Sequence, residues 1–283
     1  MELTTALARF EATDPTRLAQ TPRADLWRVQ WRGDVAVLKL LTDEGMAANE
    51  ARAADLLRIW DGRGAVRLLD ASVDGRAQLM EYLDGPLLGD IARDGDDLAA
   101  AAELAQVAMS LAQPSDPRFP DIETYGAALL MASPTLFPAR HRATFEAARS
   151  MFRHLLDTTT EQRLLHGDLH HDNIMRGTRG WAAIDPKGIN GDPHYEFANA
   201  FRNPEGLEED CARPERFHAY AETFAKATGL NAARLKQWAF AHCALSISWN
   251  LERGHSPDDD LVLLTLFANL SDAPLSRPHE RLT

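Results

Sequence analysis

Hydrophobic and polar positions follow two different patterns along this chain. In the first 82 residues, apolar residues gather in runs of strand length, arranged as two pairs. In each pair a Gly/Asp turn separates the runs, a pattern that predicts antiparallel hairpins. The pairs are LWRVQWR and VAVLKLL around Gly33-Asp34, and AVRLLDAS and RAQLMEYL around Asp74-Gly75. Between the two pairs, the alanine-rich stretch 46–60 predicts one helix.

After Gly85-Pro86 the pattern changes to apolar residues at helical spacing. Helices are expected near 97–112, 121–132, 138–157, 209–228, 231–252 and 257–270. They are interrupted by HGDLHHDN (166–173) and by NIMR-GTRG-WAAID (173–185), a strand-turn-strand pattern. The fold class predicted is therefore α+β, with a small antiparallel sheet and one helix in the first lobe and a larger, mainly helical second lobe.

Composition and charge narrow the function. The 283 residues are 45% hydrophobic and 25% charged, as in ordinary globular proteins. The net charge of −12, without a basic cluster, argues against a nucleic-acid partner, although it can suit a cationic substrate. The first residues lack the pattern of a signal peptide, and the longest apolar run, 261–270, is about half a membrane span. With two cysteines outside any CxxC pair, we expect a cytoplasmic protein without membrane contact.

The octet HGDLHHDN carries the candidate chemistry. Asp168 and Asn173 are five positions apart, and Asp185 follows twelve residues later. Phosphoryl transfer from ATP needs a carboxylate that orients the acceptor hydroxyl, and oxygen ligands that hold Mg²⁺ against the phosphates. We therefore predict Asp168 as the catalytic base and Asn173 and Asp185 as Mg²⁺ ligands.

The three histidines of the octet are the main alternative signal. His166, His170 and His171 could suggest zinc, but the stretch lacks both the HExxH spacing and cysteines. We expect His166 to brace the loop by hydrogen bonds. His170 and His171 could either line the substrate cleft or point outward, and His170 is kept as a candidate substrate contact.

The first lobe offers groups for a nucleotide. Lys39 alternates with apolar neighbours on a predicted strand, and Glu50 follows eleven residues later on the predicted helix, where it can hold Lys39 by an ion pair. The run Met80-Glu81-Tyr82-Leu83 would offer backbone groups to adenine. Accordingly, residues 1–82 are predicted as a nucleotide-binding lobe, 83–88 as a connector, and 89–283 as the lobe with the catalytic loop and the substrate pocket.

These motifs resemble a known family. HGDLHHDN followed by IDPKG resembles the motif of the aminoglycoside phosphotransferase superfamily, which has the protein-kinase-like fold. LLHGDLHHDNIM, WAAIDPKGINGDPHYEFANAFRNP and GAVRLL look more narrowly like the streptomycin 6-phosphotransferase and hydroxyurea phosphotransferase family. The resemblance covers about residues 20–270 and implies ATP and Mg²⁺ as cosubstrates. It assigns the same roles to Lys39, Glu50, Asp168, Asn173 and Asp185.

The sequence departs from protein kinases in ways that bear on the acceptor. No glycine-rich loop is visible at 20–29, a segment that this family also tends to lack. The chain between Asp185 and Asn203 is too short for a long activation segment, so a small-molecule acceptor fits better than a protein. Asp192 and Glu196 could bind a cationic acceptor, or could cap the next helix and brace the loop. Glu196 stands where the relatives usually have aspartate.

Three functions remain open from the sequence. The first is an antibiotic kinase that phosphorylates a hydroxyl of a streptomycin-like aminoglycoside. The second is a kinase of a metabolic sugar, an amino alcohol or a hydroxyurea-like compound. The third is a catalytically silent nucleotide-binding protein, which the intact set of five polar residues disfavours. The oligomeric state does not follow from the sequence.

Overall fold

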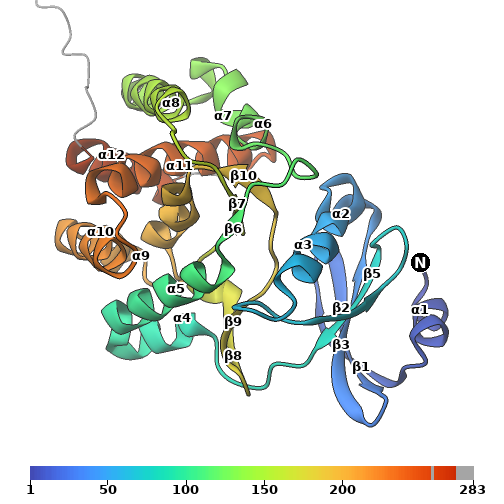
Figure 1. Ribbon diagram of the computed structural model, residues 1–283. Helices are drawn as coiled ribbons and strands as arrows, with labels where there is room; N and C mark the ends of the chain where they lie inside the picture. The colour runs from blue at the N-terminus through green and yellow to red at the C-terminus, as the bar shows by residue number, and fades with distance from the viewer. Residues whose placement is uncertain (256–257, 272–283) are drawn as a thin grey trace, which may run out of the picture. The chain divides into compact units, whose positions relative to one another are not determined.

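The structure is a computed structural model that describes residues 1–255 and 258–271 (Figure 1). The chain divides into two compact units. The first contains Met1–Leu88 and Asn173–Gly188, and the second contains Gly89–Asp172 and the chain from Ile189 onward. Within the described residues, no helix is both long enough and apolar enough to cross a membrane.

A five-stranded antiparallel sheet forms the centre of the first unit, in the order β1-β2-β3-β5-β4. Its strands are β1 (Thr13–Gln20), β2 (Ala24–Trp31), β3 (Asp34–Leu41), β4 (Leu68–Ala71) and β5 (Ala77–Glu81). Both predicted hairpins are confirmed. In the first, however, the turn residues are Arg32 and Gly33, which both have positive φ, while Asp34 pairs with Trp31. Positive φ at both central positions matches the right-handed twist of the strands.

The helical part of the first unit differs from the prediction of one helix over 46–60. The stretch contains α2 (Asp43–Ala47), the short 3-10 helix η1 (Glu50–Arg52) and α3 (Ala53–Trp60). The break falls at Asn49, whose φ of 60° is incompatible with a continuing α-helix. Two further elements, α1 (Leu3–Phe10) and β1, were not predicted. Every residue of β1 is exposed and the strand contains Pro15, so it has no apolar alternation to detect.

The hairpin after the octet packs with the first unit. Its strands β8 (Ile174–Gly177) and β9 (Gly180–Ala183) pair antiparallel, as predicted. Their outer backbone groups bond to earlier segments: Val66 N donates to Ala183 O at 2.9 Å, and Arg176 N donates to Pro86 O at 3.0 Å. The division predicted from the sequence puts this hairpin with residues 89–283. Its backbone hydrogen bonds to residues 64–66 and 85–86, which no local pattern encodes, place it with the sheet instead.

The second unit is mainly helical. Its elements are α4 (Leu88–Ile91), η2 (Ala92–Asp96), α5 (Asp97–Leu111), α6 (Ile122–Tyr125), α7 (Ala127–Met131), η3 (Pro134–Leu136), η4 (Ala139–His141), α8 (Arg142–Asp157), η5 (His171–Asn173), η6 (Pro193–Arg202), α9 (Glu208–Cys211), α10 (Pro214–Thr228), α11 (Ala232–Glu252) and α12 (Asp258–Leu270). Three short strands, β6 (Gln113–Pro114), β7 (Arg163–Leu165) and β10 (Ile189–Gly191), form an unpredicted sheet. The helix expected over 121–132 is interrupted at Gly126, where the Phe152 ring leaves no room for a side chain.

The core of the second unit surrounds α11, which is buried along most of its length. Trp238 packs edge-on against Phe152, and Phe217 stacks on Phe267 with ring centroids 4.5 Å apart. Because α11 also contacts η6, α8 and α12, it supports η6, the helix that comes after the octet and the β8–β9 hairpin. Glu196 of η6 accepts hydrogen bonds from His166 N and Gly167 N, so this packing supports the start of the octet.

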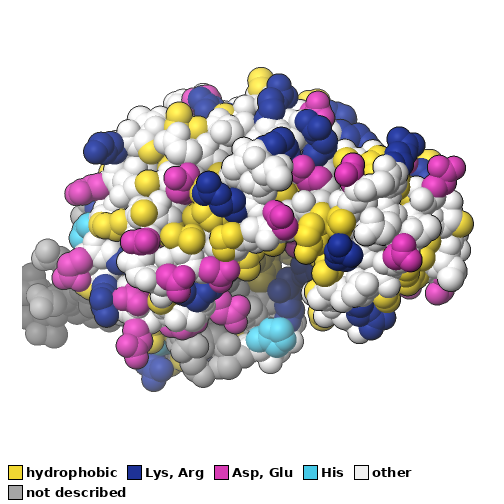
Figure 2. All heavy atoms as spheres, turned by 90° about the horizontal axis from the view of Figure 1, so that it is seen from below, with side chains coloured by type: hydrophobic (Ala, Val, Ile, Leu, Met, Phe, Trp, Pro, Cys, Tyr) yellow, Lys and Arg dark blue, Asp and Glu magenta, His cyan; other side chains and the backbone are white. Residues whose placement is uncertain are grey.

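The charged residues are mixed on the face of the molecule drawn in Figure 2. Lys and Arg side chains lie scattered among Asp and Glu side chains there, rather than gathered in one basic strip. A duplex-binding surface requires clustered positive charge. The absence of nucleic-acid binding remains a prediction from the sequence.

Candidate active site

A buried lysine and two acids form a polar cluster in the first unit. Lys39, in the central strand β3, is 5% exposed, and its Nζ lies 2.6 Å from Asp185 Oδ1 and 3.4 Å from Glu50 Oε2. Glu50 is supplied by η1 and Asp185 by the segment after β9. The structure therefore brings together three residues that are up to 146 positions apart in sequence. Burial alone would lower the pKa of Lys39, but the two carboxylates more than offset it and raise that pKa.

The two predicted metal ligands lie at the same end of the β8–β9 hairpin. Ile184 N donates to Asn173 O at 2.8 Å, which continues the register in which Ile174 faces Ala183. Asp185 comes next, in a left-handed conformation with φ of 57°. Its side chain is 52% exposed although one oxygen contacts Lys39. An amide oxygen and an accessible carboxylate are hard donors of the kind that Mg²⁺ prefers, so the residues present fit that ion.

Glu50 is shared among several cations. Besides Lys39, its carboxylate lies 3.3 Å from Arg23 Nη1 and 3.7 Å from Lys187 Nζ. The Lys187 side chain is 24% exposed and is therefore partly buried. Lys187 follows Asp185 by two positions, and the structure thus places a second lysine beside the cluster.

The predicted adenine segment continues from β5. Glu81 N donates to Arg67 O at 3.0 Å, and the Glu81 carboxylate accepts from Arg67 N at 2.7 Å and from the Arg179 guanidinium. Leu83 is buried close to Gly177. A small cavity of about 40 Å³ is lined by Glu81, Leu83 and the β8–β9 turn. Met80 lies inside the sheet and Tyr82 is partly exposed beside Arg28.

In the second unit, Asp168 is held by a residue that sequence reasoning missed. Asn199 Nδ2 donates to Asp168 Oδ1 at 2.8 Å, and Asp168 N donates to His166 Nδ1 at 3.3 Å. Asn199 is in the 3-10 helix η6, three residues after Glu196. Residues three apart in a 3-10 helix lie on the same face. That spacing is the signal from which Asn199 could have been found once the 3-10 helix was recognised.

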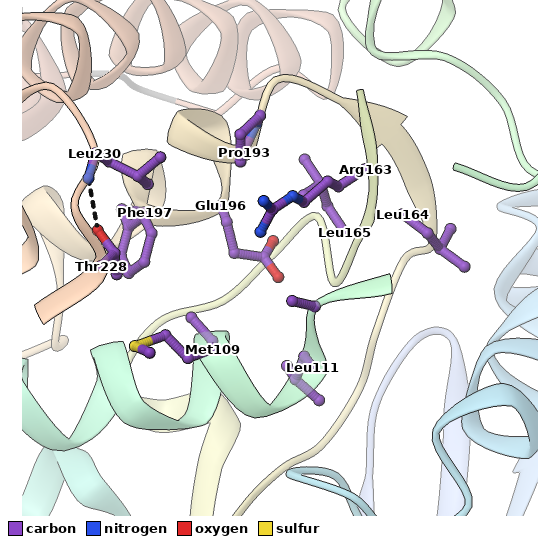
Figure 3. A pocket seen from close by; sticks show the side chains of 12 residues that line it. Met109, Leu111, Arg163, Leu164, Leu165, Pro193, Glu196, Phe197, Thr228 and Leu230 are labelled. Carbon is purple, nitrogen blue, oxygen red and sulfur yellow. Dashed lines mark hydrogen bonds between the residues drawn. The ribbon is translucent and has the colours of Figure 1, made fainter. Parts of the chain in front are cut away.

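Glu196 braces the loop that precedes Asp168. Its carboxylate accepts hydrogen bonds from His166 N at 2.9 Å and Gly167 N at 3.1 Å, and the residue is 6% exposed. Burial raises the pKa of Glu196 to about 7, despite the two backbone hydrogen bonds that favour its charged form. Figure 3 shows this carboxylate beside a largely apolar pocket of about 190 Å³, which Leu111 and Arg163 also line. The bracing alternative describes this placement better than a substrate contact does.

Asp192 is also enclosed. Its side chain is 3% exposed, caps η6 through His194 N at 2.9 Å, and bonds to Trp238 Nε1 at 3.0 Å and to Arg234 Nε. Burial alone would raise the pKa of Asp192, but the hydrogen bonds from His194 and Trp238 hold it well below its usual range. With its carboxylate oxygens used inside the protein, Asp192 occupies the capping position that was the alternative to an acceptor contact.

The histidines of the octet differ in placement. His166 and His171 are fully buried, and His170 is partly buried. His166 takes part in the loop bond to Asp168 N, while His171 Nε2 lies 3.2 Å from the Tyr220 hydroxyl. Burial lowers the pKa of His171 to about 3. Among the described residues, no group of three or more His, Cys, Asp or Glu side chains is arranged to hold a metal ion.

Comparisons with known proteins identify the family. Residues 9–254 match the family described as aminoglycoside/hydroxyurea antibiotic resistance kinase. The chain is 36% identical to streptomycin 3''-kinase from Klebsiella pneumoniae over 204 residues, 70% of this chain and 75% of that protein. It is 32% identical to hydroxyurea phosphotransferase from Kitasatospora aureofaciens over 235 residues, 78% of this chain and 64% of that protein.

Solved structures agree on the fold. A ternary complex of a thermostable mutant of aminoglycoside phosphotransferase APH(4)-Ia with ADP and hygromycin B is similar with a TM-score of 0.66. It is 16% identical, covering 96% of this chain and 98% of that one. Choline kinase LicA from Streptococcus pneumoniae is similar with a TM-score of 0.63 at 12% identity, covering 95% and 96%. The predicted family resemblance and the predicted α+β, protein-kinase-like fold class are both confirmed.

Proposed function

We propose that this chain, which belongs to the aminoglycoside/hydroxyurea antibiotic resistance kinases and is a phosphotransferase with an alcohol acceptor, uses ATP and Mg²⁺ to phosphorylate a streptomycin-like aminoglycoside. The observation that carries the ATP site is the pairing of buried Lys39 with two acids. One is Glu50, and the other is Asp185, whose side chain is 52% exposed. The relatives named as streptomycin kinases support the acceptor class. A cytoplasmic location, where ATP is available, belongs to the same proposal.

In this proposal the nucleotide is bound by residues of the first unit. Lys39 steadies the inner phosphates, and Glu50 keeps the lysine in position. Asn173 and Asp185 would hold Mg²⁺, which when bound neutralises charge on the terminal phosphates. The segment Met80-Glu81-Tyr82-Leu83 offers backbone groups to the base. The complex of APH(4)-Ia with ADP supports a nucleotide site in this fold.

The acceptor is activated by residues of the second unit. Asp168 accepts the hydrogen of the attacking hydroxyl and orients its oxygen toward the terminal phosphorus. Asn199 donates a hydrogen bond to one oxygen of Asp168 and so fixes the orientation of this carboxylate. Glu196 holds the backbone of His166 and Gly167 immediately before the base. Because the transition state of phosphoryl transfer is loose, most of the acceleration comes from such positioning.

The decisive variant is Asp168→Asn. It keeps the size of the side chain and one hydrogen-bonding oxygen, but it removes the base. A positioned base typically contributes about 10²–10⁴-fold. We expect turnover to fall within that range while ATP binding and the free energy of unfolding stay close to those of the wild type. Wild-type turnover in Asp168→Asn would remove Asp168 from the mechanism.

The acceptor is tested by a substrate panel. Mg²⁺-dependent consumption of ATP is measured with streptomycin, other aminoglycosides, sugars, amino alcohols and hydroxyurea. Turnover of streptomycin supports the proposal, whereas turnover of a metabolite or hydroxyurea alone favours the second candidate, for which hydroxyurea phosphotransferase is a relative. Absence of any turnover would favour a nucleotide-binding protein without catalysis.

A further inference from the structure

The apolar pocket beside Glu196 has no ligand in the proposed function. Its wall combines the end of α5, the strand β7, the start of η6 and the end of α10. It is named the Glu196 pocket, and the residues that matter for its chemistry are Ala108, Met109, Leu111, Leu165, Glu196 and Phe197. All of them belong to the unit that carries Asp168. The described lining does not include Asp168 itself, so the pocket is separate from the predicted base.

The Glu196 pocket has room for one small ring. Its volume is about 190 Å³. An apolar cavity of about 150 Å³ is enough to bind benzene. Leu111 and Leu165 are buried, whereas Met109 is 49% exposed, so the pocket reaches the surface at this methionine. A methionine side chain is flexible and adapts its shape to a ligand. A small ring can therefore enter beside Met109 and replace water on the apolar wall.

The pocket also holds a buried negative charge. Figure 3 shows the Glu196 carboxylate between the apolar side chains of η6, β7 and the end of α5. Among the described residues, its hydrogen-bond partners are the backbone N–H groups of His166 and Gly167, and neither is a cation. Burial, and to a smaller extent the charge of Asp168, raise the pKa of Glu196. A positive group brought by a ligand would therefore stabilise this carboxylate.

Arg163 is a cationic residue of the described lining, but it bonds elsewhere. Its Nε donates to Glu161 Oε1 at 2.6 Å, and its side chain is 42% exposed. Solvent screens the charge of an exposed guanidinium, so Arg163 offsets little of the charge of Glu196. The pocket thus combines an apolar wall with one carboxylate that lacks a counter-charge.

We propose that the Glu196 pocket is a binding site for a small organic cation that consists of one apolar ring and one ammonium group. The ring packs against Leu111, Leu165 and Phe197, and the ammonium group donates a hydrogen bond to the Glu196 carboxylate. Hydrogen bonds between charged groups are about twice as strong as those between neutral groups. The apolar wall selects against polar compounds with several charges, so this ligand class differs from the proposed acceptor.

Benzylamine is the probe, and benzyl alcohol is its uncharged counterpart with the same ring. Binding is followed by NMR of the full chain with isotope-labelled methionine methyl groups, where Met109 reports on the pocket and Met131, which is 83% exposed, is the control. Benzylamine should shift the Met109 signal with a dissociation constant on the order of 1 mM or lower and leave Met131 unchanged. Benzyl alcohol should bind about tenfold more weakly. Equal affinities, or no saturable shift at Met109, would overturn the proposal.

Two substitutions separate the pocket from its charge. Ala108→Leu fills the pocket and should weaken both probes more than about tenfold, because a packed interior has no space for the ring. Its control, Ala102→Leu, makes the same change at an exposed position of α5 and should leave both affinities within about twofold. Glu196→Gln removes the charge and should weaken benzylamine about tenfold and benzyl alcohol less than about threefold. Unchanged benzylamine affinity in either pocket variant contradicts the site, and Glu196→Gln decides if Ala108→Leu does not fold.

This proposal and the proposed function fail independently, because binding of benzylamine needs no phosphoryl transfer. Saturating benzylamine should leave the KM for streptomycin unchanged. An increase in that KM that persists in Ala108→Leu would place benzylamine in the acceptor site and overturn the assignment of the pocket. Binding at Met109 without turnover of any compound in the substrate panel would sustain the pocket and overturn the proposed function.

Discussion

Asp185 and Asp192 are seven residues apart, yet their side chains differ strongly in exposure and in hydrogen bonding. The Asp185 side chain is 52% exposed, with one oxygen against Lys39, whereas the Asp192 side chain is 3% exposed and surrounded by donors. The Asp185 side chain is therefore accessible to a ligand. The Asp192 side chain is not, because His194, Arg234 and Trp238 use its carboxylate.

This difference distinguishes the acids of this segment that serve chemistry from the acids that stabilise the fold. An acid that stabilises the fold is saturated by donors of its own unit, and it should be sensitive in stability measurements. An acid that serves chemistry keeps part of its hydrogen-bonding capacity for substrate or metal, and its loss should be visible in turnover. Glu196 is intermediate, since it is buried but bonds to the backbone next to the predicted base.

Of the residues that test this comparison, Asp185 has the largest expected effect. Asp185→Asn keeps the shape of the side chain but removes the charge that faces Lys39 and the proposed metal. Turnover should fall about 10²–10³-fold, the usual loss when one electrostatic group of an active site is removed. The free energy of unfolding should change less than in Asp192→Asn. Both are measured on the same preparations, by steady-state kinetics and urea unfolding, and a stability loss without a turnover loss would reverse the comparison.

The second prediction concerns Asp192. Asp192→Asn removes the charge from a buried network and should cost about 2–4 kcal/mol in the free energy of unfolding. The interactions that lower the pKa of Asp192 stabilise the folded protein fully at pH values above the pKa of this group in the unfolded chain. This stabilisation is lost as the pH falls through the lower pKa of the folded protein. Urea unfolding at neutral pH measures the loss. Activity per folded molecule should remain, so a variant that is stable but inactive would place Asp192 in the chemistry after all.

The third prediction uses the pKa of Glu196. Because burial raises it from 4.5 to about 7, the folded protein binds more protons than the unfolded chain between these values. The contribution of this group to stability therefore falls as pH rises through the window. Relative to Glu196→Gln, which does not titrate, the wild type should lose roughly 2–3 kcal/mol between about pH 5 and 7.5. Glu222→Gln, at an exposed position, is the control and should follow the wild type; a pH-independent difference between Glu196→Gln and the wild type would contradict the raised pKa.

The smallest expected effect is at Lys187. Its Nζ lies 3.7 Å from Glu50, which Lys39 and Arg23 also contact. Lys187→Ala should therefore change the free energy of unfolding by less than about 1 kcal/mol and the KM for ATP by less than about threefold. Kinetics at varied ATP concentration measure this. A large increase in the KM for ATP would add Lys187 to the nucleotide site and enlarge the cluster around Asp185.

Much of the fold could be predicted because local patterns of apolar and polar residues determine it. The two hairpins of the first unit and the helices α5 and α11 follow from strand-length runs and helical spacing, whereas the helix predicted near 209–228 is divided into α9 and α10. The pattern failed at β1, whose residues are all exposed, and at Asn49, where a single left-handed residue divides the predicted helix. Exposed strands and backbone breaks leave no periodic trace, since both depend on partners that are distant in sequence.

By itself the sequence determined that Asp168, Asn173 and Asp185 follow one another across a loop and a hairpin. A loop and a hairpin form between neighbouring residues, so a local pattern is enough to predict them. It also supplied Lys39 and Glu50 as candidates for the pair that the structure forms. Only the tertiary structure decided that Asp192 is enclosed and that Asn199 holds Asp168. The physical reason is that desolvation and hydrogen bonding of a carboxylate depend on groups brought from other elements, such as Trp238 on α11, and no spacing along the chain encodes them.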